Sequence, residues 1–222
     1  MMAYAKNWLI SLCLFAAATL TGQSTYFDIL LNYTPTNFHY GDNQSALKDY
    51  RKQVWGIQAG GSWQAGISPT LSVVPEFYFM MQGGQLKGGN PLTGGATKTR
   101  LYSLELPLLA RLHLSRFYAN AGPSVAYNLT GTRKIDPTGE LPAVKETLRF
   151  DGSEGAFKRW DAGLQLGVGY ELPLKKARVA FDVRYHHGLV NLHEGAETYN
   201  RYWLMNILIS KPWKSNPLGK RR

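Results

Sequence analysis

Seven charged side chains lie inside apolar, strand-like segments, and they are the residues of this chain best placed to do chemistry. They are Glu76, Glu105, Arg111, Asp161, Glu171, Asp182 and Arg184. Carboxylates and guanidiniums that face one another in a confined space can act as a relay, or they can form a structural ion-pair network. We favour the network, because a lone buried charge is costly and a narrow interior has to be filled with side chains.

A second group, His186, His187, His193 and Glu194, suggests a metal site. Successive residues of a strand point to opposite faces, so His186 and His187 cannot share an ion, and we predict no metal and no cofactor. Asp182 and His186 share a face but lie about 13 Å apart along a strand, which is beyond hydrogen-bond reach. The sequence pattern points to no nucleophile. A catalytic triad assembled from different strands remains an alternative, because the sequence does not give the strand register. We therefore expect no enzymatic activity.

The segments that carry these residues alternate between apolar and polar positions. The clearest example is the hairpin from Arg100 to Leu129, whose two arms alternate throughout their length. This period of two is that of a β-strand. The same pattern predicts eight strands, over residues 26–33, 53–65, 71–81, 100–114, 117–129, 159–172, 178–187 and 201–213. The Gly-rich stretch from Gly83 to Gly95 is expected to be a surface loop, because no helix follows that would complete a phosphate-binding loop.

The connections between the predicted strands alternate between long and short. Long extracellular loops and short periplasmic turns are typical of bacterial outer-membrane barrels. The predicted fold is therefore all-β, an eight-stranded antiparallel up-and-down transmembrane β-barrel.

A soluble ligand-binding barrel also alternates, but with its apolar face inward. Here the apolar face carries large residues, with aromatic residues near strand ends, as in the interfacial girdles of membrane barrels. These aromatic residues are Tyr102, Phe117, Tyr127, Trp160, Tyr170, Trp203 and Trp213. The polar face is crowded with glycine and serine, which suits a narrow interior. We therefore expect the apolar face to contact lipid.

The N-terminus has the features of a secretory signal peptide. Lys6 precedes an apolar run over residues 8–20, which is too short to span a bilayer as a helix. We divide the chain into a signal peptide (1–23), an outer-membrane barrel (24–213) and a basic C-terminal tail (214–222). Cys13 is the only cysteine, so the mature chain contains no disulfide.

The formal net charge is +10. In the predicted topology a basic rim faces the periplasm, formed by Lys175, Lys176, Arg178, Lys214, Lys220, Arg221 and Arg222. Such a rim either anchors the barrel at lipid headgroups, which we favour, or contacts an acidic envelope protein. Nucleic acid is not an expected partner of an exported barrel.

Several stretches resemble the PorT-like outer-membrane β-barrel proteins of gram-negative bacteria. They are VVPEFYF from Val73, YSLELPLLARL from Tyr102, FYANAGPSVAY from Phe117 and FDVRYHHGLVNL from Phe181. The matching positions are Pro75 and Glu76; Glu105 and Pro107; Gly122 and Pro123; and Arg184, Tyr185, Gly188 and Leu189. The resemblance implies the outer membrane of a gram-negative bacterium. It also implies, from some family members, a role in protein secretion across that membrane.

Together these features predict a monomeric outer-membrane barrel with a packed polar interior and a structural or interaction role, with a secretion accessory as the specific hypothesis. A small solute channel is the competing function, although eight strands leave little lumen. A lipid-modifying enzyme is third, and the soluble ligand-binding barrel remains the alternative fold.

Overall fold

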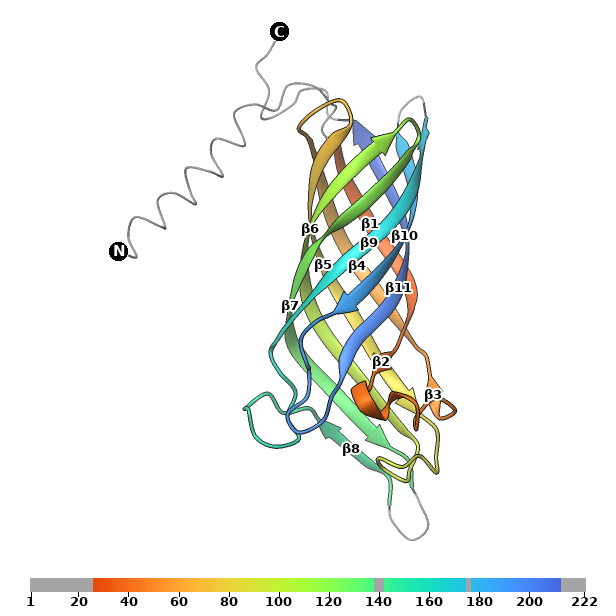
Figure 1. Cartoon of the computed structure of the whole chain (residues 1–222), viewed down its shortest axis with the longest axis vertical. Coiled ribbons are helices and arrows are strands. Elements are labelled where there is room, and N and C mark those ends of the chain that lie inside the picture. The colour runs from red at the N-terminus through yellow and green to blue at the C-terminus, as the bar shows by residue number, and fades with distance from the viewer. Residues whose placement is uncertain (1–25, 138–141, 175–176, 213–222) are drawn as a thin grey trace, which may run out of the picture.

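The computed structural model describes residues 26–137, 142–174 and 177–212, and these form a closed antiparallel barrel of eight long strands (Figure 1). The strands are β1 (Tyr26–Thr36), β4 (Val54–Gly66), β5 (Leu71–Leu86), β6 (Thr97–Leu114), β7 (Phe117–Ile135), β9 (Trp160–Pro173), β10 (Arg178–Gly188) and β11 (Tyr199–Pro212). Each pairs with the next, and β1 pairs with β11. The predicted fold class is confirmed.

The barrel closes by pairing its first and last long strands. The register runs from Tyr26 opposite Pro212 to Leu30 opposite Leu208. Closure matters because lipid offers no hydrogen-bond partner to an open sheet edge. No helix in the described part of the chain is long and apolar enough to cross a membrane.

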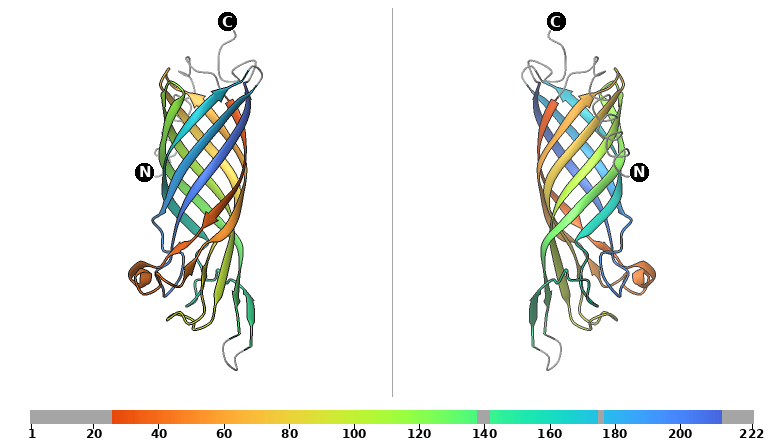
Figure 2. Two further views of the ribbon diagram at one scale, coloured as in Figure 1. Left: turned by 90° about the vertical axis from the view of Figure 1, so that its right-hand side faces the viewer. Right: turned by 90° about the vertical axis from the view of Figure 1, so that its left-hand side faces the viewer.

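Three short strands and one 3-10 helix lie beyond the wall of the barrel. They are β2 (Phe38–His39), the 3-10 helix η1 (Gly41–Gln44), β3 (Arg51–Lys52) and β8 (Val144–Thr147). The short strands pair with long ones: β2 with β11, β3 with β5, and β8 with β7. These elements gather at one end of the molecule, opposite the end where the described chain begins and finishes (Figures 1 and 2).

The two ends of the barrel differ in the length of their connections. Short turns join β4 to β5, β6 to β7 and β9 to β10, and in the second of these Ser115 adopts a positive φ of 62°. Long connections follow β1, β5, β7 and β10 at the other end. Short turns mark the periplasmic end of an outer-membrane barrel, so the end with β2, β3 and β8 is extracellular.

Side chains alternate between the outside and the lumen as expected. Ile29, Leu166 and Met205 are 65%, 65% and 62% exposed, whereas the neighbouring Asp28 and Asn206 are buried. Aromatic rings pair on the outer wall, with centroids 4.8 Å apart for Tyr33 and Trp55, 4.9 Å for Tyr127 and Trp160, and 4.8 Å for Phe117 and Tyr170. The apolar face therefore contacts lipid, and the soluble ligand-binding barrel is wrong.

Several strands are longer than their sequence pattern suggested. β5 continues to Leu86 and β6 begins at Thr97, so the connecting loop covers residues 87–96 and the start of the Gly-rich stretch belongs to β5, contrary to expectation. Glycine supplies the same backbone groups to a ladder as any other residue, which is why Gly83 pairs with Arg100. The predicted signal peptide and basic tail lie outside the described residues.

Close strand packing at Gly122 gives a test of the barrel wall. A Cβ atom there would lie 2.1 Å from the Leu108 carbonyl oxygen and 2.9 Å from Leu109 Cα. Because backbone cannot move aside cheaply, Gly122→Ala should destabilise the folded barrel by about 1–3 kcal/mol. The measurement is a urea titration of the fast-migrating folded band in unboiled electrophoresis samples.

Gly88→Ala is the matched control. The nearest atom to a Cβ at Gly88 is Ala96 N at 3.7 Å, so this variant should unfold at the wild-type urea concentration. Equal unfolding midpoints for the two variants would contradict the packing argument.

Candidate functional site

A cluster of three charged side chains crosses the middle of the lumen. Arg184 on β10 donates two hydrogen bonds to Glu76 on β5, from Nη1 to Oε2 at 2.6 Å and from Nη2 to Oε1 at 2.9 Å. Its Nε donates to Asp182 Oδ2 at 2.8 Å. All three side chains are fully buried. This central cluster is the bidentate arrangement that makes arginine–carboxylate pairs strong.

Amide side chains extend the central cluster to the opposite wall. Asp182 accepts hydrogen bonds from Asn120 on β7 at 2.8 Å and from Asn206 on β11 at 2.6 Å. Asn32 on β1 donates to Gln58 on β4 at 2.7 Å and also to Asn206. The lumen at this level is therefore spanned by side chains from six of the eight strands.

A second cluster fills the periplasmic end of the lumen. Arg178 Nη2 donates to both Asp28 oxygens, at 2.9 and 3.0 Å, and its Nη1 donates to Glu171 at 2.6 Å. Arg111 lies beside it, 3.9 Å from Glu171, with its guanidinium 4.1 Å from the centre of the Tyr118 ring. This basal cluster joins β1, β6, β7, β9 and β10.

The placement of Arg178 corrects one expectation. We expected it on an exposed basic rim, but its side chain is buried in the lumen and is paired with Asp28 and Glu171. The expectation was wrong because Arg178 shares the inward parity of Asp182 and Arg184 on β10. The other predicted rim residues, Lys175, Lys176, Lys214, Lys220, Arg221 and Arg222, lie outside the described residues.

Two buried carboxylates nearer the extracellular end have no arginine partner in the described part of the chain. Glu105 accepts from Tyr202 at 3.2 Å and from Gln165 at 3.1 Å, and Asp161 accepts from Asn200 at 2.5 Å. We expected the seven lumen charges to form ion pairs and hydrogen bonds inside the barrel. Glu105 and Asp161 are held by hydrogen bonds from neutral donors.

A cross-strand triad was the enzymatic arrangement that the sequence left open. Ser124 Oγ lies 3.4 Å from His186 Nδ1, and Glu105 Oε1 lies 3.6 Å from the same nitrogen. A catalytic triad needs the nucleophile and the acid on different ring nitrogens. His186 also stacks on Tyr202, with ring centroids 4.6 Å apart. The three side chains are buried, so this arrangement suits packing better than catalysis.

The histidines do not assemble a metal centre. Among residues 26–137, 142–174 and 177–212, no three His, Cys, Asp or Glu side chains form a group that could hold a metal ion. His186 is buried in the lumen, whereas His193 lies in the extracellular segment and packs edge-on against Phe157 at 5.0 Å.

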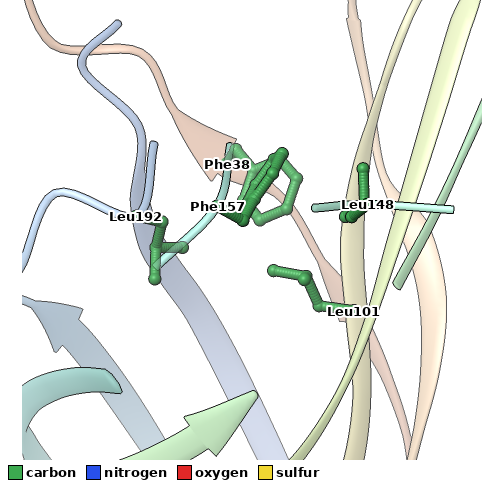
Figure 3. Packing of buried hydrophobic residues seen from close by; sticks show 5 residues of the cluster. All are labelled: Phe38, Leu101, Leu148, Phe157 and Leu192. Carbon is green, nitrogen blue, oxygen red and sulfur yellow. The ribbon is translucent and has the colours of Figure 1, made fainter. Parts of the chain in front are cut away.

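The extracellular segments form a hydrophobic cluster of their own, which sequence reasoning missed. It is built from Phe38, Leu101, Leu148, Phe157 and Leu192, all less than 7% exposed (Figure 3). The sequence pattern predicted residues 34–52 and 130–158 only as long connections between strands. The apolar residues within those loops were the signal that could have shown a folded cap.

Polar groups around this extracellular cap are partly withdrawn from water. Burial raises the pKa of Tyr40 to about 12, and the opposing effect of Arg51 and Arg133 is smaller. Burial, with help from Arg133, lowers the pKa of His193. These directions follow from the packing of the cap around its hydrophobic cluster.

Comparison with known protein families agrees with this architecture. The barrel has a lipid-facing apolar wall, a polar lumen, and long loops at the end opposite its short turns. The pattern of the outer membrane protein beta-barrel domain family matches residues 31–194, more than half of the chain. The chain belongs to this family. A search of curated proteins gives no match.

Solved structures of the same kind share little sequence with this outer-membrane barrel. OprG of Pseudomonas aeruginosa is 13% identical, with 87% of this chain and 98% of that chain covered and a TM-score of 0.45. Ail, the attachment invasion locus protein of Yersinia pestis, is 11% identical over 85% and 99%, with a TM-score of 0.42. Neisserial surface protein A is 11% identical over 86% and 98%, with a TM-score of 0.43.

The central cluster gives a stability prediction. Arg184→Met would leave Glu76 and Asp182 buried without their cation, and breaking a buried pair in this way costs about 3–5 kcal/mol. The triple variant Glu76→Gln, Asp182→Asn, Arg184→Met removes all three charges and should recover most of that loss. Urea unfolding of the barrel in lipid vesicles measures both. A triple variant as unstable as Arg184→Met would show that volume, and not charge, is what matters there.

Proposed function

We propose that this protein is a monomeric, non-conducting outer-membrane barrel with a structural or interaction role, and that it acts without catalysis. Its specific role, in this proposal, is that of a PorT-like accessory to protein secretion across the outer membrane. The single observation that carries the non-conducting part is the central cluster, whose fully buried side chains cross the lumen.

The distribution of empty space supports a closed lumen. One cavity of about 220 Å³ opens at the periplasmic end beside Glu171 and Arg178. Another, of about 240 Å³, lies in the extracellular cap beside Phe38 and Phe157. The basal and central clusters separate the two. Eight strands enclose room for packed side chains and little else.

Conductance distinguishes this proposal from the small solute channel. In planar bilayers the wild-type barrel should give no steady single-channel steps, because hydrated ions cannot pass the central cluster. The fast-migrating folded band, recovered from the same vesicles that are fused with the bilayer, serves as the control that the wild-type barrel is folded and inserted. Steady, uniform steps from the wild type would overturn the non-conducting barrel.

The interaction role is supported by the two ends of the molecule. The extracellular cap is packed around a hydrophobic cluster, so it offers a partner a surface of fixed shape, which a solvated loop would not. The sequence after β11 is strongly basic, and β11 finishes at the periplasmic end. A basic periplasmic segment suits either lipid headgroups or an acidic envelope protein. The PorT-like motifs on β5, β6, β7 and β10 support a place near the secretion machinery.

Crosslinking in intact cells tests the partner. Lys220→Ala with Arg221→Ala should reduce recovery of crosslinked envelope proteins at least about threefold, because it removes two cations from the docking segment. Lys134→Ala with Lys145→Ala, on the extracellular β7–β8 ribbon, removes the same charge elsewhere and should leave recovery unchanged. Undiminished recovery from the tail variant would assign the basic residues to membrane anchoring.

A deletion strain that exports its full set of extracellular proteins would contradict the secretion role.

A further inference from the structure

A basic pocket lies on the outer wall at the extracellular end, where β2 and β3 meet β10 and β11. It has a volume of about 290 Å³, and its lining includes His39, Arg51 and Arg201 together with Tyr185 and Trp203. No carboxylate lines it. It is separate from the lumen clusters and from the apolar cavity of the cap.

The two arginines of this pocket have buried donors without an acceptor in the described part of the chain. The Nε atoms of Arg51 and Arg201 are buried and have no hydrogen-bond acceptor. Neither arginine forms an ion pair within the described ranges, whereas Arg133, Lys134 and Lys158 each pair with a carboxylate. A buried donor without an acceptor costs free energy, which an incoming anion would recover.

His39 adds a third donor to the lining of the pocket. Its Nδ1 accepts a hydrogen bond from the Gly41 amide at 3.2 Å, which leaves the proton of the neutral ring on Nε2. Burial, followed by the charges of Arg201 and Arg51, lowers the pKa of His39. Glu197 acts in the opposite direction with a smaller effect, and its Oε2 accepts from the Asp42 amide at 3.2 Å. The pocket is therefore positive before any ligand binds.

The depth of the pocket in the membrane indicates which anion it meets. Arg201 and Trp203 share the outward face of β11, and Trp203 packs on Tyr185 with ring centroids 5.1 Å apart. Below them on the same face, Met205 and Ile207 are exposed to lipid. Aromatic rings at this position mark the headgroup level of the outer leaflet. A ligand in the pocket can thus hold its charged group on the arginines and its acyl chains on the wall below.

We propose that the pocket formed by His39, Arg51 and Arg201 binds the phosphate monoester of an outer-leaflet glycolipid headgroup. A planar guanidinium matches phosphate oxygens with two parallel hydrogen bonds, and the two Nε donors have no other use in the described structure. Free phosphate shares this chemistry but lacks acyl chains to lie along Met205 and Ile207.

Native mass spectrometry of the full-length barrel in detergent micelles tests the proposal. The probes are lipid A with one phosphate, the same lipid A after enzymatic dephosphorylation, and inorganic phosphate. Wild-type protein should bind the phosphorylated lipid at least about tenfold more tightly than either other probe. Arg51→Gln with Arg201→Gln should weaken that binding at least about tenfold, since two charge-assisted contacts are removed.

Arg149→Gln with Lys134→Gln is the matched control, because it removes two extracellular cations outside the pocket and should leave the affinity unchanged. The fast-migrating band of unboiled samples verifies that each variant is folded, and the wild-type probe series stands even if a variant is not. Equal affinity for dephosphorylated lipid A would overturn the proposal. Inorganic phosphate binding as tightly as the lipid would assign the pocket to a soluble anion and would also overturn it.

Discussion

Closure of β1 on β11 is the constraint on which the rest of the structure depends. In lipid every backbone N–H and C=O must find its partner within the protein, so a sheet can cross the bilayer only as a closed ring. With eight strands the ring is narrow, and its inner face must be filled by its own side chains. The apolar parity already faces lipid, and the polar residues are therefore brought together inside. Closure of the barrel is therefore a sufficient reason for charged side chains to meet in the lumen, and a catalytic role is not required to explain them.

Polar residues confined in this way must satisfy one another. The central cluster does so with one arginine between two carboxylates, and the basal cluster does so with Arg178 between Asp28 and Glu171. Each joins strands that are far apart in sequence, so the interactions that fill the lumen also fix the register around the ring. Glu105 shows another solution, in which tyrosine and glutamine donors take the place of a cation.

The sequence predicted which way side chains point, but not which side chains meet. Parity alone places Asp182 and Arg184 on one face of β10, two residues apart, so their contact was predictable. Their contact with Glu76 depends on the packing across a closed lumen, which no local pattern records. Arg178 had the correct parity for the lumen, but its position beside a lysine-rich turn suggested the rim. The extracellular cap was missed because its apolar residues are scattered through segments without periodicity.

The division of charge between lumen and exterior connects these observations. The described lumen holds Arg111, Arg178 and Arg184 against six carboxylates, so the interior is acidic although the whole chain carries +10. The cationic surplus must then lie outside the lumen. Most carboxylates of the chain either face the lumen or already form surface ion pairs. A cation without a carboxylate partner is stabilised by water where it is exposed, but a buried donor gains free energy by binding an anion. At the depth of a membrane headgroup the available anions are those of the lipid, and the Nε atoms of Arg51 and Arg201 have no acceptor within the described chain, which fits the ligand that we propose for them.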